Sequence, residues 1–398
     1  MKKKLMLMSP MLHQGGFERV CITTARLMEP YFDVTIVIFN SANMAYDVEG
    51  LKIIDIQMGA KKGTLQKLWN IVKRSRKVRQ LKKQMKPDIV YSFGPTANMV
   101  NAFSRTGREK VWLGLRNYTD VEERLKIKLF TKRADLMICC SKTIEQELKE
   151  HFHFDKTATL YNLYDVKAIR EKAKQNEPKL PWGAYDDQGR KIRCMVSMGR
   201  DDDMKGFWHM LKAFSLVHEK MPEVRLILVG AGSFSCYKKL AEDLNITDAI
   251  YFAGMQREPY QYLNKGEIYL LTSSNEGFPN ALVEGMSLGL AAVSVNCMTG
   301  PAEILLEDGD ASLLEEQESG KAIPVIYGAY GILLPVMAKE RDLDAEHILP
   351  EEKKMADVVL ELLKDDDMLK KYQGAALERA QCFTYESYRD KFMKLTLI

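Results

Sequence analysis

The amino-acid sequence predicts an α/β protein built from two Rossmann-like domains in series, each a doubly wound parallel sheet. Its 398 residues exceed the roughly 250 to 300 residues at which a single hydrophobic core stops growing. Short runs rich in β-branched residues alternate with longer amphipathic segments, which is typical of βαβ units. This alternation stops once and then restarts, so we expect two such domains.

The predicted strands are short apolar runs in both halves of the chain. They cover residues 1–8, 33–39, 88–91, 111–115 and 135–139, and then 193–197, 224–229, 249–252, 268–271 and 291–295. Residues 173–190 contain two prolines, two glycines and little apolar periodicity, which is the composition of a linker. We therefore place an N-terminal domain at residues 1–180 and a C-terminal domain at 181–380, with a last helix at about 380–398 packing back on the first domain.

Composition excludes several classes of protein. Hydrophobic (46%), charged (28%) and aromatic (9%) residues occur at the levels of a folded globular protein, not of a disordered chain, a collagen or a coiled coil. The longest apolar stretch, residues 322–338, is shorter than the ~20 residues that span a bilayer. Seven scattered cysteines lack Cys-x-x-Cys spacing, so we expect no zinc site and a reducing, cytoplasmic compartment.

The net charge of +4 conceals two halves of opposite sign. Residues 1–190 hold 35 Lys and Arg against 21 Asp and Glu, a balance of +14, and the remainder carries −10. The segment 61–86 has eleven Lys or Arg and no acid, with apolar residues for one face of a helix: Leu65, Leu68, Trp69, Val72 and Leu81. Basic amphipathic helices of this kind bind anionic membrane surfaces; a solvated helix is the alternative.

Gly15 and Gly16 form a glycine turn between the first predicted strand and an apolar-periodic helix. Without side chains there, backbone N–H groups can approach a phosphate at the positive end of the helix. An ordinary tight turn accounts for the same two glycines equally well.

A second candidate anion site follows the first strand of the second half. That strand runs into Gly199-Arg200, and Lys205-Gly206 opens the next helix. The planar guanidinium of Arg200 and the ammonium of Lys205 can clamp a diphosphate without a metal. The alternative is two solvated charges beside the aspartates at 201–203.

Gly230 and Gly232 follow a strong predicted strand and match the first two glycines of a dinucleotide-binding fingerprint. The third glycine position is Ser235, so an NAD site is not expected. A ligand crevice at the carboxyl end of the second sheet remains consistent with the turn.

The segment 273–289 combines two carboxylates with the start of a helix. Pro279 suits a first helical turn and Gly289 a helix end, which puts Glu276 in the preceding loop and Glu284 inside the helix. Such carboxylates can accept hydrogen bonds from sugar or ribose hydroxyls, while free N–H groups around residues 278–280 face an anion. Compensation of the helix dipole is the alternative for either Glu alone.

Together these segments resemble the family 4 retaining glycosyltransferases of the GT-B fold. The resemblance rests on Gly15-Gly16, Gly199-Arg200, Lys205-Gly206, Gly230-x-Gly232, Glu276-Gly-Phe-Pro-Asn with Glu284, and Gly300-Pro301-x-Glu303, in the order expected along nearly the whole chain. It implies two Rossmann-like domains facing a cleft, with the nucleotide-sugar donor held mainly by the second domain and the acceptor by the first.

The resemblance also implies roles for individual residues. Arg200 and Lys205 would neutralise the donor diphosphate, Glu284 would hold the ribose hydroxyls, and Glu276 would contact the donor sugar. Gly15 and Gly16 would let the first domain close on the diphosphate. The remaining donor contacts would come from Gly230, Gly232, Phe278, Pro279, Asn280, Ala281 and Leu282.

The sequence departs from the family pattern at one site position. Many relatives have a His after the strand at 111–115, where this chain has Arg116-Asn117, so Arg116 is a candidate replacement as a charge donor. No metal is expected: the aspartates at 201–203 fall between the diphosphate ligands and are interpreted as loop. No function is assigned to residues 306–334; within them, the run beginning at Tyr327 is similar to that of bacterial surface-polysaccharide members.

The resemblance predicts a retaining, metal-independent hexosyltransferase without a cofactor. It would move a hexose or N-acetylhexosamine from a UDP-sugar, or second a GDP-sugar, to a lipid-linked saccharide in bacterial capsule, exopolysaccharide or lipopolysaccharide synthesis. It would work as a peripheral protein on the inner face of the cytoplasmic membrane. A nucleotide-sugar epimerase of the same fold is one rival; a nucleic-acid-binding protein is another, but it leaves both glutamates and the glycine turns unexplained.

Overall fold

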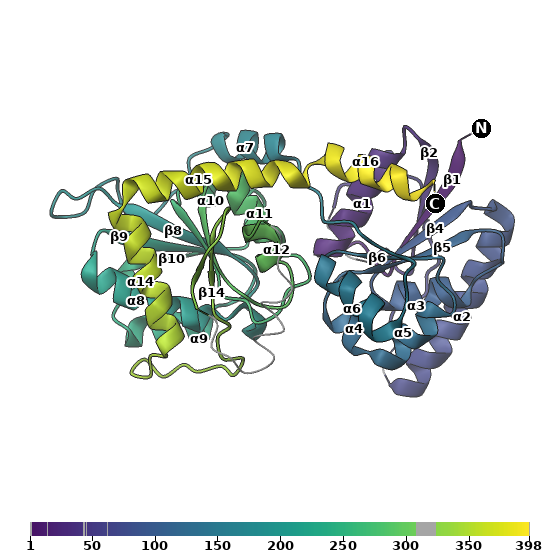
Figure 1. Cartoon of the computed structure of the whole chain (residues 1–398), viewed down its shortest axis with the longest axis horizontal. Coiled ribbons are helices and arrows are strands. Elements are labelled where there is room, and N and C mark those ends of the chain that lie inside the picture. Colours follow the sequence, from purple (N-terminus) through teal and green to yellow (C-terminus); the bar gives the residue numbers. More distant parts are fainter. Residues whose placement is uncertain are drawn as a thin grey trace. The chain divides into compact units, whose positions relative to one another are not determined.

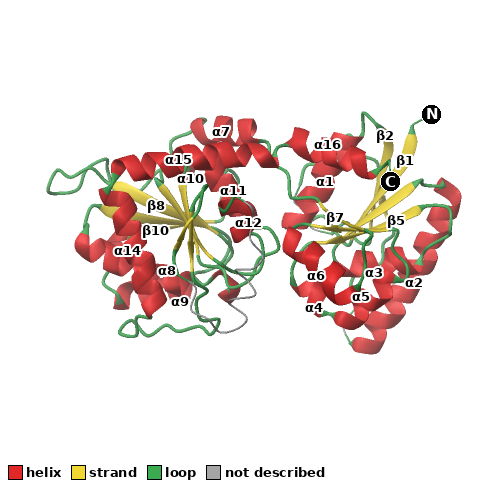
Figure 2. Ribbon diagram, viewed as in Figure 1, coloured by secondary structure: helices red, strands yellow, loops and turns green. Residues whose placement is uncertain are grey.

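The computed structural model describes residues 2–13, 15–42, 44, 46–61, 63–307 and 324–397. The chain divides into two compact units, each built around its own sheet (Figures 1 and 2). The first unit comprises Met1–Leu163 and Tyr385–Ile398, and the second comprises Tyr164–Thr384. Both are parallel-sheet α/β domains, the layered arrangement that alternating strands and helices predict.

The first unit has a parallel seven-stranded sheet in the order β3-β2-β1-β4-β5-β6-β7. Its central strands are mostly apolar and buried along most of their length, because helices cover both faces. The strands are β1 (Lys3–Ser9), β2 (Phe32–Ile38), β3 (Ile53–Asp55), β4 (Ile89–Phe93), β5 (Lys110–Leu115), β6 (Leu136–Cys139) and β7 (Thr157–Thr159).

The described residues of the first unit form seven helices. They are α1 (Gly16–Met28), α2 (Thr64–Met85), α3 (Pro95–Phe103), α4 (Thr119–Glu122), α5 (Arg124–Thr131), α6 (Lys142–Phe152) and the C-terminal α16 (Tyr385–Leu395). The last of these lies in the first unit although it follows the second in sequence. Tyr388 exchanges a 2.7 Å hydrogen bond with Thr24 of α1, and Phe392 packs edge-on against Trp112 with ring centroids 5.5 Å apart.

The second unit repeats the topology, with sheet order β10-β9-β8-β11-β12-β14-β13. Its strands are β8 (Arg193–Met198), β9 (Val224–Val229), β10 (Ile250–Gly254), β11 (Ile268–Leu271), β12 (Ala291–Val295), β13 (Ile326–Tyr327) and β14 (Ile332–Leu334). The β13–β14 pair alone is antiparallel among the strands described. In both sheets the order reverses beside the first strand, which creates a switch point between β1 and β4 and another between β8 and β11.

The second unit has eight described helices, four of which contribute residues to one large apolar core. The eight are α7 (Val166–Lys174), α8 (Phe207–Lys220), α9 (Ser235–Asp243), α10 (Tyr260–Leu263), α11 (Asn280–Ser287), α12 (Pro301–Leu305), α14 (Pro350–Lys364) and α15 (Asp366–Ala380), with single 3₁₀ turns η1 (Asp203–Lys205), η2 (Thr247–Ala249) and η3 (Gln381–Phe383). Residues 308–323, most of the acidic excursion noted in the sequence, lie outside the described residues. No helix among those described is long and apolar enough to cross a membrane.

The division between the units differs from the predicted boundary at 180/181, because it falls at 163/164. Helix α7 belongs to the second unit: Arg170 Nε donates to the Ser287 carbonyl (2.8 Å) and Lys172 pairs with Glu258 (3.1 Å). The Pro- and Gly-containing stretch that suggested a linker is likewise held within that unit. Its turn is closed by a 2.7 Å ion pair between Arg190 and Asp186.

Candidate active site

Lys205 and Glu276 form an ion pair at the switch point of the second sheet. Lys205 ends η1, which follows β8, and Glu276 lies in the loop after the neighbouring strand β11. Lys205 Nζ donates to Glu276 Oε1 at 2.7 Å, and the two side chains are 18% and 13% exposed. The sheet thus brings together two candidate residues that are 71 positions apart in the sequence.

The backbone around Lys205 is fixed to the loop after β11. Thr272 Oγ1 donates to the Lys205 carbonyl (2.9 Å), and the Ser274 N–H donates to the Met204 carbonyl (2.8 Å). Gly206 has φ +60°, and a Cβ there would stand 2.4 Å from the Thr272 carbonyl oxygen. Glycine is therefore required for the close approach of these two loops.

The backbone of Glu276 is fixed from the opposite side, by the loop that follows β12. Glu276 N–H donates to the Met298 carbonyl and Thr299 N–H donates to the Glu276 carbonyl, both at 2.7 Å. Thr299 Oγ1 also donates to the Gly277 carbonyl at 2.7 Å. Both members of the ion pair are consequently held on backbone that is hydrogen-bonded on each flank.

The electrostatics of this pair keep the lysine charged. Burial lowers the pKa of Lys205, but the Glu276 charge and its hydrogen bond outweigh burial, so the pKa lies above its ordinary value. The nearby Cys297 thiol has a pKa raised well above its usual range by burial and by the Glu276 charge. At neutral pH the site offers a fixed cation beside a carboxylate and an inert thiol.

Gly230 and Gly232 lie so close to other parts of the protein that neither position has room for a Cβ atom. A Cβ on Gly230 would lie 1.7 Å from the Gly199 carbonyl oxygen, and one on Gly232 (φ +139°) would lie 2.0 Å from Asp201 Cβ. The Asp201 carboxylate accepts from the Phe234 N–H at 2.7 Å. This turn after β9 is therefore packed tightly onto the turn after β8.

The three consecutive aspartates all have structural partners. Asp202 accepts from the Met204 N–H (3.0 Å) and caps η1, while Asp203 pairs with Arg341 at 3.0 Å. Among the described residues, no group of three or more His, Cys, Asp or Glu side chains is placed to hold a metal ion. These contacts place Asp201 and Asp202 in the connection after β8 and Asp203 in the 3₁₀ turn η1.

Arg200 differs from Lys205 in its surroundings. Its side chain is 70% exposed, and its nearest acidic group is the Asp202 carboxylate at 3.9 Å. The two residues proposed from the sequence as a clamp are thus a fixed lysine and a solvated arginine.

Glu284 lies in α11 with a nearly buried side chain, at 3% residue exposure. Tyr260 OH donates to its Oε1 at 3.2 Å. Burial raises the pKa of the neighbouring Tyr269, and the charges of Glu284 and Glu276 add to that shift. The hydroxyl of Tyr269 meets the Met198 N–H at 3.3 Å, so this tyrosine of β11 is tied to the end of β8.

At the start of α11, the side chains are mostly packed within the protein, so a ligand would meet the backbone there. Pro279 is the N-cap residue and the helix begins at Asn280. Phe278 packs edge-on against Phe383 with ring centroids 5.3 Å apart, and Leu282 is fully buried, so neither of these side chains is available to a ligand. Asn280 accepts a 2.5 Å hydrogen bond from Tyr164, and Ala281 follows it on the first turn.

In the first unit the candidate glycines lie at the start of α1. Gly15 is its N-cap and Gly16 its first residue. The Glu18 carboxylate folds back over this turn, so that a Cβ on Gly15 would stand 2.2 Å from Glu18 Oε2. The first turn of α1 therefore already has a carboxylate beside it.

Arg116, the third candidate of the first unit, follows β5 and joins an aromatic network. Its guanidinium donates to Tyr91 OH and to Asn162 Oδ1 (3.3 Å) and lies 5.0 Å from the centre of the Phe93 ring. Its backbone N–H donates to Asp120 Oδ2 at 2.8 Å. These contacts join β4, β5 and the loop before α7.

Comparisons with known proteins decide the family. The sequence model of glycosyltransferase family 4 matches residues 14–168, and that of glycosyl transferases group 1 matches residues 189–323. An uncharacterized glycosyltransferase of Methanocaldococcus jannaschii is 30% identical over 348 residues, covering 80% of this chain and 82% of the relative. The chain belongs to glycosyltransferase family 4.

Other relatives agree with this membership. The N-acetylgalactosamine-N,N'-diacetylbacillosaminyl-diphospho-undecaprenol 4-alpha-N-acetylgalactosaminyltransferase of Campylobacter jejuni is 22% identical over 94% of this chain and 93% of its own. Amylovoran and lipopolysaccharide glycosyltransferases also match. The crystal structure of Anabaena HepE in complex with UDP covers all of both chains with a TM-score of 0.71 at 18% identity, which shows that the fold is GT-B.

Several residues that build the site of this glycosyltransferase were missed in the sequence. Thr272 and Tyr269 hold the ends of β11 and β8, and Tyr260 contacts Glu284. Gly94, at the carboxyl end of β4, has φ +86° and approaches the Phe17 ring. Only Gly94 gave a usable signal, because Gly-Pro after an apolar run marks a strand-to-helix turn.

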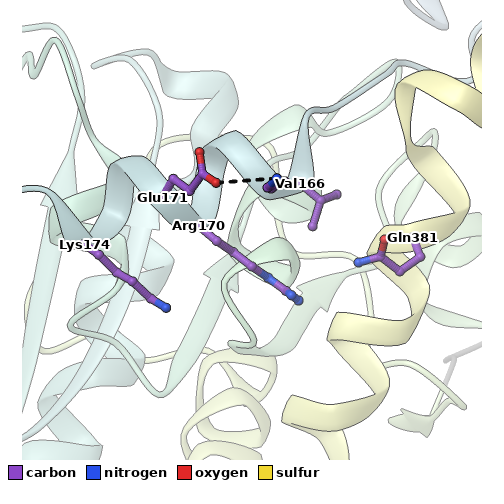
Figure 3. A pocket seen from close by; sticks show the side chains of 6 residues that line it. Val166, Arg170, Glu171, Lys174 and Gln381 are labelled. Atoms are coloured by element: carbon purple, nitrogen blue, oxygen red, sulfur yellow. Dashed lines mark ion pairs between the residues drawn. The ribbon is translucent and has the colours of Figure 1, made fainter.

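The glycosyltransferase has a pocket of about 240 Å³ away from these residues, formed by α7 and η3 (Figure 3). Its lining residues are Val166, Lys167, Arg170, Glu171, Lys174 and Gln381. Arg170 is engaged with the Ser287 carbonyl, and Lys167 pairs with Glu171 at 4.0 Å. The pocket contains no residue proposed for the donor site.

Proposed function

We propose that this family 4 enzyme is a retaining, metal-independent glycosyltransferase that uses a UDP-sugar, or second a GDP-sugar, and a lipid-linked saccharide acceptor. The sugar moved would be a hexose or N-acetylhexosamine, and the site of action the inner face of the cytoplasmic membrane. The observation that carries the donor half of the proposal is the Lys205–Glu276 pair at the switch point of the second sheet, where open α/β sheets bind ligands.

In this proposal Lys205 neutralises the charge that develops on the departing nucleoside diphosphate. A cation fixed by two hydrogen-bonded loops needs little reorganisation as that charge appears, which is the basis of electrostatic stabilisation of a transition state. Its raised pKa keeps it charged at neutral pH. A charge supplied by the chain in this way supports independence from a divalent metal.

Glu276 has two roles in this proposal. It orients Lys205 through the 2.7 Å contact, and its carboxylate faces the sugar, where it stabilises positive charge at the anomeric carbon. Glu284, nearly buried and hydrogen-bonded to Tyr260, is proposed to accept from ribose hydroxyls. The N–H groups at the start of α11 would bind the sugar and phosphate.

The choice of donor and acceptor draws on named relatives. Anabaena HepE was crystallised with UDP, with UDP-glucose and with UDP and glucose. The Campylobacter relative is named for transfer of N-acetylgalactosamine in alpha linkage to a diphospho-undecaprenol-linked sugar. These names support a UDP-sugar donor and a lipid-linked acceptor for this chain.

Helix α2 supports a membrane-bound acceptor, because its outward face is apolar at the N-terminal end. Leu65, Leu68, Trp69 and Val72 follow the i, i+3, i+4, i+7 spacing of a single stripe, and they are 83%, 58%, 55% and 40% exposed. Leu81 does not belong to this face; it packs on the domain core beside Val78. The stripe is therefore four residues long.

The face of α2 that meets the domain carries buried polar residues as well as the apolar Val78 and Leu81. Asn70 and Arg74 are buried and donate to the carbonyls of Gly59 and Met58 at 2.9 Å, and Lys82 is buried against Glu109 at 3.1 Å. The stripe of four exposed apolar residues faces away from the domain, so its apolar area is available to bind another surface. Lys67, Lys73, Arg76, Lys77, Arg79 and Lys83 are exposed on the same helix, which matches an anionic lipid surface.

Vesicle binding tests the acceptor half of the proposal. The wild-type protein should co-sediment with phosphatidylglycerol vesicles more than with phosphatidylcholine vesicles. The variant Leu68→Ser/Trp69→Ser should lose most of that binding, because about 0.8 kcal/mol is lost for each CH₂ no longer buried in lipid. The matched control Leu125→Ser changes a residue that is 85% exposed outside α2. Equal binding of anionic and neutral vesicles would contradict the proposal.

A thermal-shift panel tests the donor half without knowledge of the acceptor. UDP, GDP, ADP, NAD and nucleotide sugars would be compared with and without magnesium, because a ligand of the native state raises stability by RT ln(1 + [L]/Kd). We expect a magnesium-independent rise with UDP that disappears in Lys205→Ala. Stabilisation by NAD alone, or by no nucleotide, would refute the donor assignment.

A further inference from the structure

His209 lies on the first turn of α8, four residues after Lys205, and is buried with both ring nitrogens engaged. The residue is 1% exposed. Nδ1 lies 2.6 Å from Glu352 Oε1, and Nε2 lies 2.9 Å from the Ala338 carbonyl oxygen. Neither contact belongs to the family motif from which the donor site was predicted.

The two contacts fix where hydrogen must be. A carbonyl oxygen only accepts, so Nε2 carries a hydrogen. Nδ1 then either donates to an ionised Glu352 or accepts from a protonated one. In both cases one proton lies between Nδ1 and Glu352 Oε1, and the two side chains together carry no net charge. Glu352 is fully buried, and its second oxygen accepts from the Leu349 N–H at 2.7 Å, which caps α14. Each polar atom of this buried pair is thereby satisfied.

The same face of α8 makes further contacts with the loop that leads to α14. Lys212, one turn after His209, donates to Asp342 (2.9 Å) and to the His347 carbonyl (2.8 Å). Arg341 of that loop pairs with Asp203 of η1 at 3.0 Å. The segment carrying Lys205 is consequently held on one side by the loop after β11 and on the other by residues 338–352.

We propose that His209 and Glu352 are positioning residues, which fix the start of α8 and through it the Lys205 turn against residues 272–276. The backbone N–H of His209 donates to the Gly206 carbonyl at 3.0 Å. His209 thus contacts Glu352 through its side chain and the Lys205 turn through its backbone. The consequence for diphosphate binding rests on the proposed function; the positioning of the turn does not.

The experiment compares three variants of the full chain. His209→Ala removes the contacts. Glu352→Gln keeps them, because the amide NH₂ can donate to Nδ1 while its oxygen accepts from the Leu349 N–H. His218→Ala is the matched control: the same substitution on the same helix, at a histidine whose Nδ1 meets the Val224 carbonyl (3.1 Å) and which does not contact residues 338–352 by a described hydrogen bond. If His209→Ala leaves Glu352 unpaired and does not fold, His209→Leu/Glu352→Met removes both polar partners together.

Two readouts separate positioning from a general loss of structure. Hydrogen–deuterium exchange of peptides covering residues 201–208 in the ligand-free protein should be about tenfold faster in His209→Ala and close to wild type in the other two variants. The Kd for UDP should rise about tenfold in His209→Ala, with little change for UMP. In a Lys205→Ala background the substitution should add no further loss of UDP affinity.

Unchanged exchange at 201–208 in folded His209→Ala protein would overturn the proposal. Equal weakening of UDP and UMP binding would also overturn it, because the effect would not pass through the diphosphate contact. If the wild-type protein binds no nucleoside diphosphate, the proposed function fails, and the exchange measurement still decides whether the pair positions the turn.

Discussion

The two sheets share their central strand order, yet the residues at their carboxyl ends serve different purposes. In the second unit, Lys205 and Glu276 meet at the β8–β11 switch point on backbone that is hydrogen-bonded from both flanks. In the first unit, Arg116 supports the aromatic residues of β4, and Glu18 covers the turn at Gly15. A repeated topology thus supplies two equivalent edges, and local contacts decide which edge holds an ordered, charged site.

The largest expected difference between the units comes from removing one cation from each. Lys205→Met should lower the rate of nucleoside diphosphate release from the donor sugar by about 10²-fold or more, the usual cost of deleting one preorganised transition-state contact. Its free energy of unfolding should fall by about 1 to 3 kcal/mol, because Glu276, only 13% exposed, loses its ion-pair partner. Steady-state kinetics and urea unfolding measure the two effects.

Arg116→Met is the matched variant of the first unit. It removes hydrogen bonds to Tyr91 and Asn162, so we expect a loss of about 2 to 4 kcal/mol in unfolding free energy and a smaller fall in turnover of the folded fraction than in Lys205→Met. A large loss of turnover with unchanged stability would instead assign Arg116 the charge-donating role expected from the sequence.

Glycine substitutions give a second, smaller contrast. A methyl group on Gly230 would meet the Gly199 backbone at 1.7 Å, whereas one on Gly15 would meet the end of the flexible Glu18 side chain at 2.2 Å. Backbone cannot move aside cheaply, so Gly230→Ala should cost about 3 kcal/mol and Gly15→Ala, at φ −142°, less than about 1 kcal/mol. Thermal unfolding of both variants would show whether the glycines differ in this order.

The long central strands were predictable from the sequence, and the short edge strands were not. The runs at 33–39 and 224–229 became β2 and β9 with shifts of at most one residue, because each contains four consecutive apolar residues, and such a run marks a strand buried on both faces. β3 and β7 have three residues each, which is too short for any periodicity to show. The boundary at 180/181 was misplaced because turn-forming residues occur in an ordered loop as well as in a linker.

The candidate site was predictable in its residue types but not in its pairing. Lys205 and Glu276 could be selected from their motifs, yet their contact depends on β8 lying beside β11, which is a property of the sheet order. The supporting groups, such as Thr272 and His209, carry no sequence signal because hydroxyl and imidazole side chains are common in surroundings of every kind. The roles of Arg200 and Glu284 in binding remain predictions.

The smallest expected effect compares two aspartates whose pKa is lowered for different reasons. Asp342 of the second unit is affected by burial, which raises its pKa, but hydrogen bonds from Asp344 N–H, Lys212 and His347 bring the pKa down to about 2 from 3.8. Asp33 of the first unit owes its lowered pKa to Lys52, in an exposed pair at 2.6 Å. The first aspartate is thus held by a network and the second by one solvated partner.

Because both aspartates lose their protons more readily in the folded state, each stabilises the protein fully above its ordinary pKa, and this stabilisation is lost as the pH falls through the folded value. For Asp342 the loss should occur between about pH 4 and 2. At pH 7, Asp342→Asn should therefore cost about 1 kcal/mol, and Asp33→Asn less, because solvent screens an exposed pair. Urea unfolding at pH 7, 4 and 3 would show the cost of Asp342→Asn shrinking toward acid pH; a cost independent of pH, or a larger one for Asp33→Asn, would mean that the polar network beside α8 contributes no more than an ordinary surface ion pair.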